Sequence, residues 1–113
     1  MQNQKCAISV VIPNYNGLQY IERCLESLKK QSFQEYEVIF VDNGSRDGSM
    51  EAVRENYPWV RLICLSENTG FCGAVNAGIR ASEAEYVVLL NNDTEADPDF
   101  LKELYRGISE KSK

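Results

Sequence analysis

The stretch that decides the fold is residues 87–95, Val-Val-Leu-Leu-Asn-Asn-Asp-Thr-Glu, where apolar residues give way to polar ones. An apolar run with strand propensity stops abruptly at a polar cluster that carries two acids, Asp93 and Glu95. So continuous an apolar run predicts a strand buried on both faces, with the polar residues just beyond its carboxyl end. In open parallel α/β sheets, ligands bind at that edge. For this segment alone, a polar turn between a strand and a helix is the alternative interpretation.

The rest of the chain alternates between strand and helix patterns. Strands are predicted where β-branched and apolar residues cluster between turn signals, at residues 7–13, 38–41, 60–65 and 86–90. Helices are predicted from helical spacing of apolar residues at 18–28, 50–57, 70–81 and 98–108, the last with Asp97 as cap and Pro98 at its first position. We therefore predict one α/β domain over residues 1–113, a parallel sheet of order 3-2-1-4 with helices on both faces.

This strand order brings three polar clusters, 14–17, 42–45 and 91–95, to one edge of the sheet. Strands two and four would lie about 10 Å apart, because neighbouring strands are separated by about 4.8 Å. That separation suits one acid near a nucleoside and the other near its phosphates. A carboxylate beside amide oxygens also suits a hard divalent cation, which can hold a diphosphate.

Composition excludes several classes of protein. The net charge of −5, with no basic stripe, argues against nucleic acid as a partner. The chain has no histidine and its four cysteines show no Cys-x-x-Cys pair, which excludes a Cys/His metal site and a histidine triad. Cys24 and Cys64 fall in apolar positions and are predicted to be buried free thiols in a reducing compartment. Because no apolar run is long enough for a membrane span or a signal peptide, we expect a cytoplasmic chain, with a peripheral position at the inner membrane face as an alternative.

Four segments of the chain carry a family resemblance. They are Val10-Val-Ile-Pro-Asn-Tyr-Asn-Gly17, Val41-Asp-Asn-Gly-Ser45, Asn68-Thr-Gly-Phe-Cys-Gly-Ala-Val-Asn-Ala-Gly78 and Leu89-Leu-Asn-Asn-Asp-Thr94. In this order and spacing they resemble the nucleotide-binding half of the family 2 inverting glycosyltransferases, which have a GT-A fold. The resemblance covers essentially the whole chain and implies a Rossmann-like, nucleotide-sugar-binding domain.

The resemblance also implies roles for individual residues. Asp42 would contact the base, and Asp93 would be the ligand of Mg²⁺ or Mn²⁺. The metal would neutralise charge on the departing nucleoside diphosphate. The residues implied to bind the nucleotide sugar are Pro13, Asn14, Tyr15, Asn16, Asp42, Asn43, Gly44, Ser45, Asn68, Gly73, Asn76, Asn91 and Asn92.

The chain departs from the family pattern in two ways. Asn91 replaces the first acid of the Asp-x-Asp motif, a form that resembles rhamnosyltransferase-like members. The acceptor-binding half, with the general base that inverting transfer requires, is expected beyond Lys113. We therefore expect a donor half that is inactive alone, with a saccharide or lipid-linked saccharide as acceptor in the full protein. An open sheet edge would favour self-association.

Two other functions and several structural roles remain as alternatives. A phospho-acceptor signalling domain would need an acidic pair after the first strand and a lysine near Asp93, and the sequence has neither. A non-catalytic module that binds a nucleotide sugar remains open. Asp42 and Asn43 could cap a turn, and Asn68 and Asn76 could satisfy backbone groups.

Overall fold

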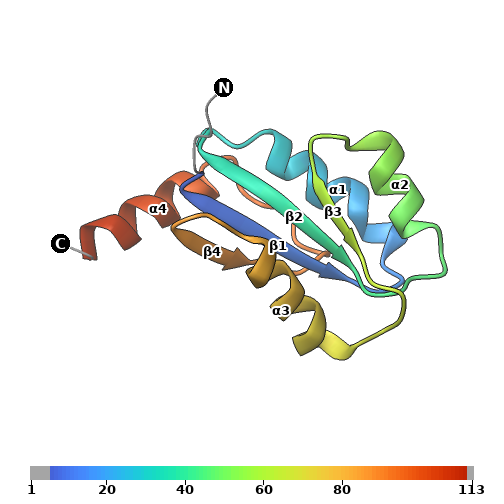
Figure 1. The fold of residues 1–113 in the computed structure, drawn as a ribbon. Helices are drawn as coiled ribbons and strands as arrows, with labels where there is room; N and C mark the ends of the chain where they lie inside the picture. The colour runs from blue at the N-terminus through green and yellow to red at the C-terminus, as the bar shows by residue number, and fades with distance from the viewer. Residues whose placement is uncertain (1–5, 112–113) are drawn as a thin grey trace, which may run out of the picture.

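The computed structural model describes residues 6–111 and contains a four-stranded parallel sheet with helices on both faces (Figure 1). The strand order is β3-β2-β1-β4, which confirms the predicted order 3-2-1-4. The strands are β1 (Ile8–Asn14), β2 (Tyr36–Asp42), β3 (Arg61–Cys64) and β4 (Tyr86–Leu89). The helices are α1 (Leu18–Lys29), α2 (Ser49–Asn56), α3 (Gly70–Ala81) and α4 (Phe100–Lys111).

Most element boundaries lie within one residue of those predicted, but β2 begins two residues earlier, at Tyr36, and α4 differs at both ends. Helix α4 begins at Phe100 instead of Pro98. Asp97 nevertheless caps the preceding turn, because its Oδ1 accepts the backbone N–H of Asp99 at 2.9 Å and its carbonyl accepts that of Phe100 at 2.9 Å. The predicted cap is therefore present, and the regular helix starts two residues later than its proline suggested.

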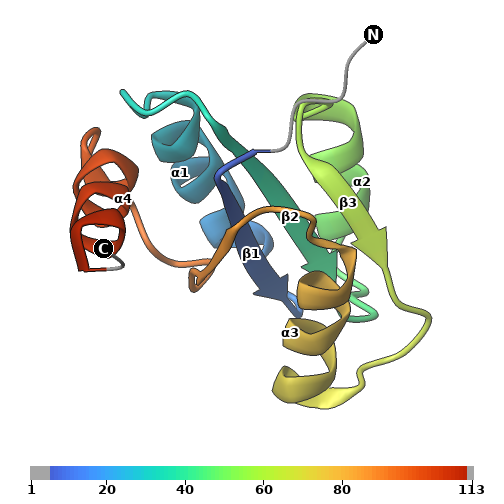
Figure 2. The ribbon, with the colours of Figure 1, turned by 60° about the vertical axis from the view of Figure 1, so that its left-hand side comes forward.

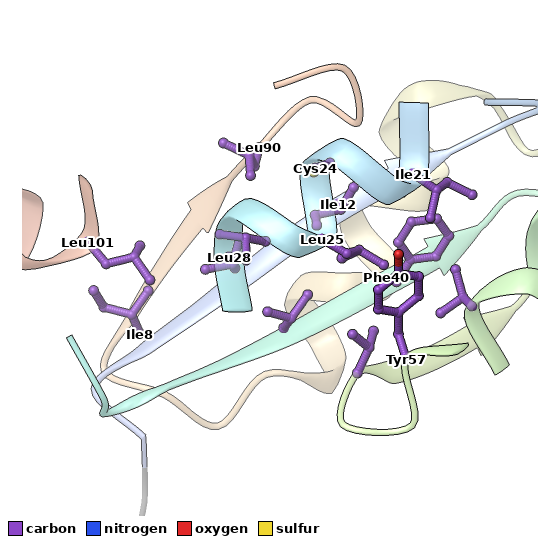
Figure 3. Packing of buried hydrophobic residues seen from close by; sticks show 14 of the residues in the cluster. Ile8, Ile12, Ile21, Cys24, Leu25, Leu28, Phe40, Tyr57, Leu90 and Leu101 are labelled. Atoms are coloured by element: carbon purple, nitrogen blue, oxygen red, sulfur yellow. The ribbon is translucent and has the colours of Figure 1, made fainter. Parts of the chain in front are cut away.

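The main core lies between the sheet and helices α1, α2 and α4 (Figure 3). Ile8, Val10 and Ile12 alternate along β1 toward this face, and Phe40 of β2 is almost fully buried beside them. Helix α1 adds side chains at helical spacing, namely Ile21, Cys24, Leu25 and Leu28, all of which are buried. Burial of these large apolar side chains supplies most of the hydrophobic stabilisation of the fold.

Within the described residues 6–111, the opposite face of the sheet carries only α3 and a much smaller apolar cluster (Figure 2). Helix α3 approaches the sheet so closely that a Cβ atom added to Gly78 would lie 2.4 Å from Cγ1 of Val11. The larger apolar side chains Phe71 and Ile79 of the same helix are 57% and 46% exposed. The inner surface of α3 consists of Ala74 and Gly78, because only small side chains fit there.

Strand β4 is an edge strand, and the prediction that it is buried on both faces is wrong. Tyr86 and Val88 pack against the main core, whereas Val87 and Leu89 are 41% and 46% exposed. Helix α3 packs over β1 and β2 and leaves the other face of β4 uncovered. The open edge expected from the sequence is therefore present in the described residues.

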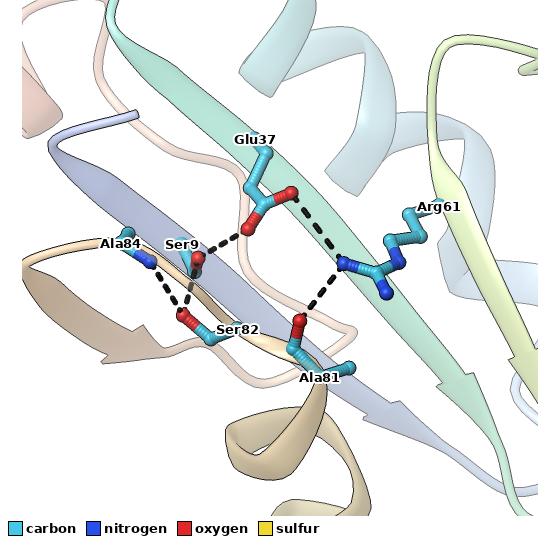
Figure 4. Close-up of polar contacts among 6 residues, drawn as sticks. All are labelled: Ser9, Glu37, Arg61, Ala81, Ser82 and Ala84. Atoms are coloured by element: carbon cyan, nitrogen blue, oxygen red, sulfur yellow. Dashed lines mark hydrogen bonds and ion pairs between the residues drawn. The ribbon is translucent and has the colours of Figure 1, made fainter. Parts of the chain in front are cut away.

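A polar cluster, buried only at Ser9, ties the carboxyl end of α3 to the sheet (Figure 4). The Ser9 hydroxyl donates a hydrogen bond to Glu37 Oε2 at 2.6 Å and accepts one from the Ser82 hydroxyl at 2.6 Å. Arg61 Nη1 donates to the carbonyl of Ala81 at 2.8 Å and lies 4.0 Å from Glu37 Oε1. These bonds hold one end of α3, and the other end lies toward the carboxyl edge of the strands.

Candidate functional site

The three polar clusters meet at Asn14, which is only 2% exposed at the carboxyl end of β1. Its Nδ2 donates hydrogen bonds to Asp42 Oδ1 at 3.1 Å and to Ser45 Oγ at 3.4 Å. Its Oδ1 accepts one from Asn92 Nδ2 at 2.7 Å. We call these four residues the Asn14 network. It joins the ends of β1, β2 and β4, so the predicted meeting of the clusters at one edge is confirmed.

Gly17 allows the Asn14 network to close, a role that the sequence did not reveal. A Cβ atom at this position would lie 2.2 Å from Asn92 Nδ2 and 2.5 Å from Asn14 Oδ1. Any side chain there would separate the two amides. The only sequence signal is the place of this glycine directly after the polar turn of the first strand.

Asp42 lies inside the site instead of on its surface. It is 2% exposed, and its second oxygen, Oδ2, accepts the backbone N–H of Ser45 at 3.0 Å. Gly44 is in the left-handed region, with a φ of 80°, and its Cβ position lies 2.7 Å from the backbone of Glu67. Asp42 therefore shapes a tight loop that packs against the segment before α3.

Asn43 holds that segment in place. Its Nδ2 donates hydrogen bonds to Asn68 Oδ1 at 3.1 Å and to the carbonyl of Gly70 at 3.0 Å. Its Oδ1 accepts from the backbone N–H of Thr69 at 2.9 Å and from the Thr69 hydroxyl at 3.0 Å. Because Asn43 is only 4% exposed and these bonds occupy both ends of its amide, it positions the start of α3.

The turn after β1 is joined to the turn after β2 by backbone and side-chain bonds. Asn16 has a φ of 52°, and its backbone N–H donates to Ser45 Oγ at 2.8 Å. Its side-chain oxygen accepts the backbone N–H of Arg46 at 2.9 Å. Asn16 thus aligns the two turns, and Tyr15 beside it is 48% exposed at the surface.

Asp47, outside the predicted site, links the starts of two helices. It accepts the backbone N–H groups of Leu18 and Ser49, each at 3.0 Å. Burial alone would raise the pKa of Asp47, but the hydrogen bonds from Ser49 and Leu18 outweigh it and lower the pKa. The signal in the sequence is an acid close to the start of a helix, one residue before the N-cap Gly48, where acceptor side chains are favoured.

The predicted residues thus divide into a buried frame and an exposed rim. Asn14, Asp42 and Asn43 form the frame. The rim that a ligand could contact consists of Tyr15, Asn16, Asn68, Asn76, Asn91 and Asp93, which are exposed, with Pro13, Gly44, Ser45, Gly73 and Asn92 half-buried among them.

The chemistry of the rim suits a metal shared with a ligand. Within residues 6–111 no three Cys, Asp or Glu side chains gather closely enough to hold a metal ion. Asp93 offers one exposed carboxylate. The pKa of the nearby Cys24 thiol is raised to about 12, mainly by burial of the thiol and to a smaller extent by the negative charge of Asp93. Mg²⁺ is commonly bound by one or two carboxylates together with substrate phosphates and water. The donor set therefore fits a cation that is completed by a diphosphate.

The chain belongs to the glycosyl transferase family 2, whose model matches residues 9–113. The signalling-domain alternative is thereby excluded. The fold corresponds to that of S. aureus TarS residues 1–349, with a TM-score of 0.84 and 30% identity over 95% of this chain and 33% of that one. This match confirms the predicted GT-A, Rossmann-like fold.

Two further relatives extend the comparison. Glycosyltransferase GlyG of Streptococcus pneumoniae serotype 4 is 34% identical over 92% of this chain and 36% of its own length. The mannosyltransferase PcManGT of Pyrobaculum calidifontis, in complex with GDP-Man and Mn²⁺, superposes with a TM-score of 0.70 and 31% identity over 80% of this chain and 28% of that one. The chain spans 36% and 31% of the length of the first two curated relatives, and as little as 13% of others.

Proposed function

We propose that this chain forms the donor-binding half of an inverting glycosyltransferase. The full enzyme would transfer a sugar from a nucleoside-diphosphate sugar to a saccharide or a lipid-linked saccharide. The observation that carries the proposal is the Asn14 network, which gathers three strand ends beneath an exposed polar rim with Asp93 beside it. Solved relatives are complexes with UDP, UDP-GlcNAc and GDP-Man, which supports a nucleotide sugar as the ligand.

The buried frame and the exposed rim would have different tasks. Rim residues such as Tyr15, Asn68 and Asn76 would contact the nucleotide sugar directly. Asn14 and Asn43 would hold the loops that present them. The base would lie over the loop that starts at Asp42. The Asp42 carboxylate would accept a hydrogen bond from the base in exchange for one of its present bonds, from Asn14 or from the backbone of Ser45. The other ligand-binding residues would be Pro13, Asn16, Gly44, Ser45, Gly73, Asn91 and Asn92.

Asp93 would hold Mg²⁺ or Mn²⁺ together with the diphosphate, where the cation neutralises charge on the departing nucleoside diphosphate. Asn92 would set the position of Asp93, because its amide is bonded to Asn14. Asn91 in place of an acid lowers the negative charge of the rim. This Asn-x-Asp form favours a hexosyl donor of the rhamnosyl type. The general base for the acceptor would come from outside residues 1–113, so the isolated chain should not transfer sugar.

The metal role is tested by titration calorimetry of UDP, GDP and dTDP, each with Mn²⁺ and with a chelator. At least one of these should bind more tightly with the metal, and Asp93→Ala should remove the metal-dependent part. Glu83→Ala is the matched control, because it removes an exposed acid just before the other end of β4. Equal affinity in metal and chelator for every nucleotide that binds would contradict the metal role of Asp93.

A non-catalytic nucleotide-sugar-binding module is the second candidate, and the single carboxylate at the metal position favours it. The test is hydrolysis or transfer of a radiolabelled nucleotide sugar by the full-length protein. Binding without turnover, with a range of acceptors, would support the module.

Location and assembly are also proposals. None of the helices in the described part of the chain has the length and apolarity needed to cross a bilayer. We propose a cytoplasmic site of action, with a peripheral position at the inner membrane face where a lipid-linked acceptor would be met.

We also propose self-association through the exposed face and edge of β4, where Val87 and Leu89 lie uncovered.

A further inference from the structure

A groove lies between α1 and the segment that leads from β4 to α4. These two parts of the chain run side by side on the α1 face of the molecule (Figures 1 and 2). The groove encloses about 780 Å³. Of its lining, only Asp93 belongs to the rim described above. The lining residues are Gln19, Tyr20, Glu22, Arg23, Glu26 and Asp93.

The walls of the groove are fixed to each other. The hydroxyl of Ser27 on α1 accepts the backbone N–H of Ala96 at 2.9 Å. Nearer the surface, Arg23 Nε of α1 lies 3.9 Å from Glu95 Oε1 of the segment that leads to α4. The exposed ion pair contributes little stability. The bond from Ala96 is part-buried, however, so a ligand would meet a groove that is already formed and would lose little affinity to ordering of the walls.

The lining has the mixture of groups that sugars require. The ring of Tyr20 is 42% exposed and offers an apolar surface for the C–H face of a pyranose. Gln19 can both donate and accept hydrogen bonds, Arg23 donates, and Glu22 and Glu26 accept. Sugar hydroxyls also donate and accept, so each can find a partner in this lining.

The charge of the lining selects against anionic ligands. Three carboxylates, those of Glu22, Glu26 and Asp93, line the groove with one guanidinium, that of Arg23. A phosphate or a uronate placed there would meet like charge. Away from the cation that Asp93 would hold, the groove is therefore a poor site for phosphates and a better one for a neutral ligand.

We propose that this groove is a subsite for neutral sugar residues of the acceptor. This proposal rests on the proposed function, because Asp93 at the end of the groove marks where the donor diphosphate would lie. An acceptor held along α1 would then reach the reacting centre from the side opposite α3. Acceptor recognition would thus begin in this part of the enzyme.

Saturation-transfer NMR with the 113-residue chain tests the subsite, using cellobiose and chitobiose as neutral probes and digalacturonic acid as the anionic probe. The neutral disaccharides should bind, and Tyr20→Ala should weaken them by about fivefold, the range of one lost aromatic contact. Tyr20→Phe keeps the ring and should retain most of the binding. Trp59→Ala is the matched control, because that ring is similarly exposed, at 40%, and lies beyond α2.

The outcomes separate the subsite from the proposed function. Nucleoside diphosphate affinity, measured on the same variants by calorimetry, should be unchanged by Tyr20→Ala, and circular dichroism should show the native fold. Nucleotide binding without any neutral disaccharide binding would overturn the subsite and leave the proposed function intact. An equal loss in Trp59→Ala, or stronger binding of digalacturonic acid, would also overturn it. Disaccharide binding without any nucleotide binding would instead overturn the proposed function on which the acceptor role depends.

Discussion

The two faces of the sheet are built in different ways. The face under α1, α2 and α4 is filled with large side chains such as Ile12, Leu25 and Phe40, all at most 1% exposed. The face under α3 is filled with small ones, and Ala74 and Gly78 allow the helix backbone to approach the strands. The first face buries apolar surface, and the second brings the backbone of α3 close to the strands. The difference indicates that stability and placement of the site are separate properties of this fold.

We call the face under α3 the thin face and the face under α1, α2 and α4 the thick face. The thin face buries little apolar surface, and polar bonds hold its helix in place instead. Ser9, Glu37 and Arg61 anchor one end of α3, and Asn43 anchors the other end beside the site. A helix held at both ends over small residues has little freedom to shift. We therefore expect substitutions on the thin face to disturb nucleotide binding, and substitutions on the thick face to disturb stability.

The largest expected effect is on the thick face. Phe40→Ala should lower the free energy of unfolding by about 3–5 kcal/mol, because it removes a fully buried ring and leaves a cavity. Urea denaturation measures this loss, and Phe40→Leu should cost much less. The fraction that remains folded should keep its nucleoside diphosphate affinity. A loss of affinity without loss of stability would contradict the division of roles between the faces.

A smaller effect is expected on the thin face. Gly78→Ala places a methyl group 2.4 Å from Val11 Cγ1, and overpacking of this kind costs about 1–3 kcal/mol. It should also weaken nucleotide binding, because α3 must move away from the sheet. Adding Val11→Ala should restore part of that affinity, since the methyl group then has room. Calorimetry and urea denaturation on the single and double variants measure the coupling.

Gly107→Ala in α4 is the control for that substitution. The added Cβ atom meets no heavy atom within 4 Å, so the variant should be neutral or slightly more stable. If Gly107→Ala and Gly78→Ala change stability and affinity alike, the close approach of α3 is not what positions the site.

The smallest effect concerns the uncovered part of the thin face. Acids flank β4 on both sides, with Glu85 before it and Asp93 after it, so an antiparallel pair of β4 strands would bring like charges together. Self-association should therefore be weak and should increase with salt. Sedimentation velocity at roughly 50 µM, a concentration where exposed edges associate, measures it. Leu89→Lys should reduce the association, whereas Leu18→Lys on α1 should leave it unchanged.

Much of the fold could be predicted because local patterns determine it. The bounds of α3 agree with the prediction residue for residue, and the strand order follows from alternating elements and right-handed crossovers. The errors lie where burial depends on distant segments. Cys64 was predicted to be buried from its apolar setting, but it is exposed at the end of the edge strand β3. Val87 and Leu89 are exposed because none of the helices in the described part of the chain covers their face of β4.

The sequence by itself determined the class of fold, the family and the set of polar residues at one sheet edge. These follow from the order and spacing of motifs, which are properties of the chain alone. Only the tertiary structure decided which of those residues are buried supports and which form the surface, as in the contrast between Asn14 and Asp93. It also decided that Gly17 must be glycine and that a groove opens beside α1. Such features depend on distances between segments far apart in the chain, and residue spacing along a sequence does not encode those distances.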